Sequence, residues 1–142
     1  MMKTIDVNLT GAIATSEAAI ELFRQQGYGQ LVGLSSFAAL RGMKGQSAYC
    51  ASKAGFSKYL ESIAIDTINE AITVTDLAPG FIDTELNRAI EKRPFLVSAE
   101  KGTKVMVDLI EKKVEFSFVP PWRWWLMAAM VKRFSRKQLS NL

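Results

Sequence analysis

The residues best suited to do chemistry lie in one stretch, where a Tyr-x-x-x-Lys pair follows a short run of hydroxyl residues. Tyr49 and Lys53 are four residues apart, so on a helix they lie one turn apart on the same face. A free phenol has a pKa of about 10, and a neighbouring ammonium lowers it by favouring the phenolate. The pair therefore predicts a general acid or base, with Tyr49 exchanging the proton and Lys53 tuning it.

A serine precedes this pair at a position where ligands often bind. Ser36 lies just past the apolar run Leu31–Leu34, which predicts a strand, and so falls at the carboxyl end of that strand. In open α/β sheets this end is where ligands bind. Ser35 also ends the run, and we interpret it as a turn hydroxyl.

The spacing of Ser36, Tyr49 and Lys53 resembles the active site of the short-chain dehydrogenase/reductase family. Two more segments agree in the same order. Residues 6–11, DVNLTG, resemble the helix segment that carries the family's catalytic Asn, and residues 78–84, APGFIDT, resemble its Pro-Gly-x-x-x-Thr segment. The resemblance covers residues 4–119 and implies hydride transfer between NAD or NADP and a carbonyl or secondary alcohol.

The resemblance assigns roles residue by residue. Tyr49 exchanges a proton with the substrate oxygen, and Lys53 lowers the pKa of Tyr49 and holds the nicotinamide ribose. Ser36 orients the substrate, while Asn8 supports a proton relay from an irregular turn of its helix. The expected cofactor contacts are Tyr49, Lys53, Pro79, Gly80, Ile82 and Thr84, with Ile82 and Thr84 near the carboxamide. We expect Pro79 to fix φ and Gly80 to free it, so that the backbone turns over a flat ligand.

The glycine-rich strand, turn and helix that hold the cofactor pyrophosphate in such folds are absent before Asn8. We therefore interpret the chain as the C-terminal catalytic half of a family member, from a truncated gene, a misplaced start or a fragment. The alternative hypothesis is a non-catalytic remnant or an interaction module associated with a membrane.

Hydrophobic periodicity predicts an α/β fold. We expect a partial Rossmann-like, doubly wound parallel sheet of about three strands with flanking helices, plus a C-terminal amphipathic helix. The strands are expected at 30–35, 71–77 and 114–119, and the helices at 5–24, 48–69 and 98–112, with Gly27 and Ser98 as caps. Residues 1–119 form the Rossmann part, 120–142 a basic tail, and 86–96 a short substrate lid.

Composition excludes several function classes. The chain is 49% hydrophobic and 23% charged, which is typical of a globular protein. It contains one cysteine and no histidine, so neither a disulfide framework nor a transition-metal site is expected. We interpret Cys50 as a small helix residue. A single cysteine fits a reducing compartment, and we expect a cytoplasmic protein.

The net charge of +4 is concentrated at the C-terminus. Residues 122–142 hold five basic and no acidic side chains, while the remainder holds 13 basic and 14 acidic ones. Three tryptophans, at 122, 124 and 125, precede four of these basic residues. The pattern of 122–137 fits peripheral contact with a membrane surface or contact with a protein equally well. No nucleic-acid-binding pattern is present.

The expected partners follow from the same features. The apolar tail and short lid favour a lipophilic alcohol or ketone as substrate, and the resemblance implies a homo-oligomer.

Overall fold

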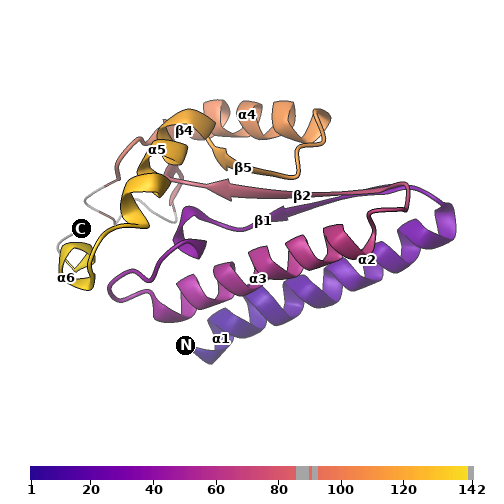
Figure 1. The fold of residues 1–142 in the computed structure, drawn as a ribbon, viewed down its shortest axis with the longest axis horizontal. Coiled ribbons are helices and arrows are strands. Elements are labelled where there is room, and N and C mark those ends of the chain that lie inside the picture. The colour runs from indigo at the N-terminus through magenta and orange to yellow at the C-terminus, as the bar shows by residue number, and fades with distance from the viewer. Residues whose placement is uncertain (86–89, 91–92, 141–142) are drawn as a thin grey trace.

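A computed structural model describes residues 1–85, 90 and 93–140, and at its centre lies a sheet of three parallel strands (Figure 1). The strands are β1 (Gly29–Leu34), β2 (Ile72–Pro79) and β5 (Phe116–Val119), in the spatial order β1-β2-β5. Parallel neighbours require long crossover connections, which the intervening helices provide. The expected α/β class, with about three strands and flanking helices, is confirmed.

Helices cover both faces of this sheet (Figure 1). The segment before β1 is nearly continuous helix, composed of α1 (Met2–Ile5), a π-helical turn η1 (Asp6–Gly11) and α2 (Ala12–Gln26). It lies beside α3 (Ser47–Asp66) on one face, and α4 (Ala99–Glu111) covers the other. This layering leaves the carboxyl ends of the strands at one edge.

Shorter elements gather at that edge. They are a 3₁₀ turn η2 (Phe37–Ala39), the helices α5 (Pro121–Val131) and α6 (Arg136–Leu139), and the parallel pair β3 (Ile82–Asp83) and β4 (Val97–Ser98). The β3–β4 pair was not expected from the sequence. The expected caps are confirmed: Gly27 ends α2 with φ 83°, and the Ser98 hydroxyl accepts a hydrogen bond from the Lys101 amide at 3.3 Å.

Two hydrophobic clusters hold the layers together. The first joins α2 and α3 to the sheet through five buried residues, Ile20, Phe56, Leu60, Ile63 and Val74. The second lies at the carboxyl edge, where α5 packs on β2 and β5 through Ala78, Phe118, Trp124 and Ala128. Part of the basic tail therefore belongs to the packed core, while the expected division after residue 119 stays a prediction.

Gly80 follows β2 and packs directly beneath Trp124. A Cβ at Gly80 would lie 1.9 Å from the Trp124 Cε2 atom, so any larger residue would displace the indole. The left-handed glycines of the described chain are Gly27 and Gly45. The expectation that Gly80 frees φ is therefore wrong, and its small size is what the packing requires.

Trp124→Ala should destabilise the fold by about 3–5 kcal/mol, because it removes a 1% exposed side chain from the second cluster and leaves a cavity. Urea unfolding followed by circular dichroism measures the change. Trp122→Ala is the matched control, since Trp122 lies two residues away and is 69% exposed. Equal losses in the two variants would contradict this packing.

Candidate functional site

The site begins where β1 ends and α3 passes over it. Lys53 lies on α3, half-buried, and its Nζ donates a hydrogen bond of 2.8 Å to the carbonyl oxygen of Leu34, the last residue of β1. Tyr49 lies one turn earlier on α3 and is also half-buried. The helix therefore brings the phenol and the ammonium to the carboxyl edge of the sheet.

The electrostatics of Lys53 follow from its position. Burial lowers the pKa of its ammonium, and the negative charge of Asp76 opposes this effect. An ammonium has three N–H donors, and the bond to Leu34 uses one of them. The remaining donors give Lys53 the capacity to bind a ligand hydroxyl.

Ser36 follows β1 directly and starts η2. Its Oγ accepts a hydrogen bond of 3.1 Å from the Ala38 amide, which leaves the hydroxyl proton to donate elsewhere. Ser35 is different, because it is 3% exposed and its hydroxyl faces the Leu77 carbonyl across the sheet at 3.5 Å. The choice of Ser36 over Ser35 as the substrate-binding hydroxyl is consistent with these positions.

Asn8 lies in the π-helical turn η1, so the irregular turn expected around it is present. This turn packs closely on α3. A Cβ at Gly55 would lie 3.2 Å from the methyl carbons of Leu9, so the absence of a side chain at Gly55 allows the approach. Asn8 is thereby carried on an element that touches the Tyr49 helix, and its relay role stays a prediction.

The remaining expected cofactor residues follow β2. Pro79 is its last residue, Gly80 lies beneath Trp124, and Ile82 lies half-buried in β3. Thr84 follows β3 and is exposed. Their cofactor contacts stay predictions. Within the expected lid, residues 86–89 and 91–92 lie outside the described residues.

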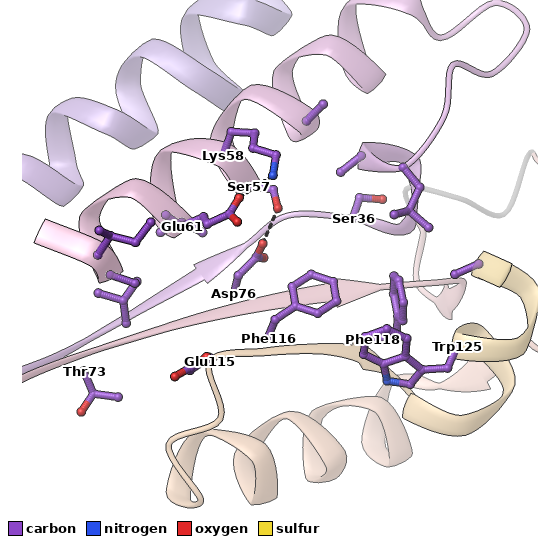
Figure 2. A pocket seen from close by; sticks show the side chains of 18 of the residues that line it. Ser36, Ser57, Lys58, Glu61, Thr73, Asp76, Glu115, Phe116, Phe118 and Trp125 are labelled. Atoms are coloured by element: carbon purple, nitrogen blue, oxygen red, sulfur yellow. Dashed lines mark hydrogen bonds and ion pairs between the residues drawn. The ribbon is translucent and has the colours of Figure 1, made fainter. Parts of the chain in front are cut away.

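A groove of about 1170 Å³ runs between α3 and α5 over β2 and β5 (Figure 2). Ser36 lines one part of it, whereas Tyr49 and Lys53 are not among its lining residues. Of the four predicted catalytic residues, Ser36 alone lines this groove.

Sequence reasoning missed three contributors: the Leu34 carbonyl that accepts from Lys53, the Asp76 carboxylate, and Ser57, whose hydroxyl donates to Asp76. Asp76 is an acid inside a strand of β-branched and apolar residues, and that anomaly was visible in the sequence. The Leu34 carbonyl gave no sequence signal, because any residue could supply it.

Other reactive groups fit a catalytic role less well. Cys50 is buried in α3. The Tyr59 hydroxyl donates to Glu17 at 2.8 Å, and burial together with this carboxylate raises the pKa of Tyr59 well above that of an ordinary phenol. Within residues 1–85, 90 and 93–140, no cluster of three or more histidine, cysteine or acidic side chains could hold a metal ion.

Over the described part of the chain, no helix combines the length and the apolar character needed to cross a bilayer.

Proteins with similar sequences are known. An uncharacterized oxidoreductase of Mycobacterium tuberculosis is 36% identical over 122 residues, which are 85% of this chain and 48% of the relative. The 3-oxoacyl-[acyl-carrier-protein] reductase of Rickettsia felis is 32% identical over 117 residues, or 80% of this chain and 48% of the relative. The chain thus spans about half the length of these curated relatives.

A solved structure shares the fold. A short chain dehydrogenase from Burkholderia cenocepacia, in complex with NADP, superposes with a TM-score of 0.81 at 18% identity, over 95% of this chain and 58% of that one. The family model described as short chain dehydrogenase matches residues 1–94, which include Asn8, Ser36, Tyr49 and Lys53. The chain belongs to the short-chain dehydrogenase family.

Proposed function

We propose that this chain supplies the catalytic half of an oxidoreductase that moves a hydride between NAD or NADP and a carbonyl or secondary alcohol. The observation that carries the proposal is the Lys53 ammonium, bonded to the Leu34 carbonyl one helical turn from Tyr49. Relatives named as oxidoreductases and a fold shared with an NADP complex support it.

The residues present fit the nicotinamide end of such a cofactor. Lys53 and Tyr49 offer hydrogen-bonding groups suited to ribose hydroxyls, and backbone amides and carbonyls around Ile82 and Thr84 suit a carboxamide. The bound nicotinamide would supply or accept the hydride. The pyrophosphate end would have to be held by residues other than those identified here.

The chain's own groups would manage the proton and the substrate. Tyr49 gives its proton to the carbonyl oxygen, or takes it from the alcohol, and the Lys53 ammonium stabilises the phenolate that forms. Ser36 donates its free hydroxyl proton to the same substrate oxygen. Asn8, carried by η1 against α3, supports proton exchange with solvent at Lys53.

The substrate class follows from the surroundings. Phe116, Phe118 and Trp125 line the groove that reaches Ser36, so a substrate with an apolar body fits this side of the site. We propose a lipophilic ketone or alcohol. The Rickettsia relative is named for 3-oxoacyl chains, which have this character. Assembly into a homo-oligomer is part of the same proposal.

Tyr49→Phe should lower kcat at least about 100-fold, because it removes the proton donor while keeping the ring. The assay follows NADH and NADPH oxidation with a panel of ketones that includes a 3-oxoacyl thioester, in the longest form of the protein that the gene encodes.

Tyr28→Phe is the matched control and should retain full activity, since Tyr28 is 67% exposed in the turn between α2 and β1, at the opposite end of β1 from the site. Activity that survives Tyr49→Phe would contradict the assignment of the general acid.

A second function has its own observation, on the outer face of α5. Trp124, Ala128 and Val131 point into the core. The other side exposes three large apolar residues, Trp122, Leu126 and Met130. Arg123 lies over the Trp122 ring at 5.1 Å, and four further basic residues follow between 132 and 137. We propose that this face rests on an anionic membrane surface, with a protein partner as the alternative.

The double variant Trp122→Ala, Leu126→Ala should weaken binding to vesicles of phosphatidylcholine and phosphatidylserine at least tenfold, because it removes apolar area from the contact. Vesicle co-sedimentation measures it. Leu22→Ala on α2, 56% exposed, is the control. Equal binding to pure phosphatidylcholine vesicles, or none to either, would contradict the membrane proposal.

A further inference from the structure

Asp76 is a carboxylate in the middle of the sheet. It lies in β2, paired with Gly33 of β1 and Phe116 of β5, and is 5% exposed. Its side chain points to the same face as Val74, toward α3. A carboxylate buried at such a place is costly unless hydrogen bonds or a counter-charge compensate for its lost hydration.

Hydrogen bonds compensate for only part of this cost. Asp76 Oδ2 accepts a 2.5 Å bond from the Ser57 hydroxyl, and the two side chains point toward one another across the groove floor (Figure 2). Asp76 Oδ1 is buried, and the described residues offer it no hydrogen-bond partner. Part of the negative charge of the carboxylate is therefore not stabilised by any hydrogen bond among the described residues.

This carboxylate lies close to the Tyr49–Lys53 pair. Tyr49, Lys53 and Ser57 are spaced four apart on α3 and form one line along its face. Lys53 donates a hydrogen bond to the carbonyl of Leu34. Leu34 follows Gly33, and Gly33 pairs with Asp76 across the sheet. The ammonium and the carboxylate thus sit above adjacent positions of neighbouring strands.

Other charges around Lys53 are weaker candidates. β1 and η2 contain no titratable side chain, and Lys3 and Asp6 of the N-terminal helix are exposed. On α3 itself, Lys58 pairs with Glu61 at the surface. Burial lowers the pKa of Lys53, and the charge that opposes this is that of Asp76.

We propose that Asp76, oriented by Ser57, is a positioning residue that keeps the half-buried Lys53 ammonium charged, one helical turn from Tyr49. This inference rests on the proposed function for its catalytic meaning. The effect of the Asp76 charge on Lys53 can be measured without turnover. The carboxylate acts through its field, since the direct bond from Lys53 goes to the Leu34 carbonyl.

The test measures the titration of Lys53 by carbon-13 NMR of its ε-carbon in the full chain, with Lys53→Arg used for assignment. In Asp76→Asn, the amide can still accept the Ser57 bond but the charge is gone. Burial then acts unopposed, so the midpoint should shift to lower pH. Glu115→Gln, which removes an exposed acid from the same groove, is the matched control and should leave the midpoint unchanged.

An unchanged or raised midpoint in Asp76→Asn, or an equal shift in Glu115→Gln, would overturn the inference. Should Asp76→Asn fail to fold, the carbon-13 chemical shift of the Asp76 carboxyl carbon is measured in the unaltered chain instead. Its chemical shift must report an ionised carboxylate at pH 7, and a protonated carboxyl at that pH would also overturn the inference.

Activity distinguishes this inference from the proposed function. If the longest protein turns over, Asp76→Asn should lower kcat at neutral pH about tenfold with KM unchanged, as a partial loss of acid–base catalysis. Absence of turnover in every variant would contradict the proposed function. The NMR titration of Lys53 would still decide whether Asp76 keeps the ammonium charged.

Discussion

The hydrogen bond from the Lys53 ammonium to the Leu34 carbonyl is the contact on which the site depends. It joins the second turn of α3 to the end of β1 and fixes the ammonium at the edge where parallel strands end. A half-buried ammonium loses part of its hydration, so its surroundings must supply acceptors and negative charge. The Leu34 carbonyl supplies the first, and the buried Asp76 carboxylate supplies the second.

The packing of the fold sets the distance between α3 and the sheet that this hydrogen bond requires. Gly33 has no side chain, and Leu60 of α3 fills the space above it, where a Cβ would lie 2.2 Å from a Leu60 methyl carbon. Gly55 does the same for Leu9 on the π-helical turn. Two glycines thus set the spacing of α3 against the sheet and against the Asn8 helix. The second cluster, built on Trp124, closes the carboxyl edge beside the site.

Much of this was visible in the sequence because it depends on local patterns. Apolar periodicity located α2 and α3, a continuous apolar run located β1, and alternating β-branched residues located β2. Gly27 marked the end of α2, and Ser98 marked the start of α4. The spacing of Tyr49 and Lys53 placed both on one helical face. These features are decided by residues close in the chain.

What the sequence could not provide are contacts between distant segments. The acceptor for Lys53 is a backbone carbonyl, and every residue type has one, so the sequence does not indicate it. Gly80 suggested a flexible turn, but its neighbour Trp124 lies 44 positions later, and only packing reveals why a side chain is excluded. The link between Ser57 and Asp76 likewise joins residues 19 apart. The short β3–β4 pair is set by tertiary context rather than propensity.

We propose that Tyr49 and Lys53 form a site for the nicotinamide end of a cofactor. Titration of the 142-residue chain with NADH and NADPH, followed by cofactor fluorescence, tests this site. We expect saturable binding that weakens in a Tyr49→Phe, Lys53→Ala double variant. Absence of binding at millimolar cofactor, or equal binding by the double variant, would contradict the claim for this chain.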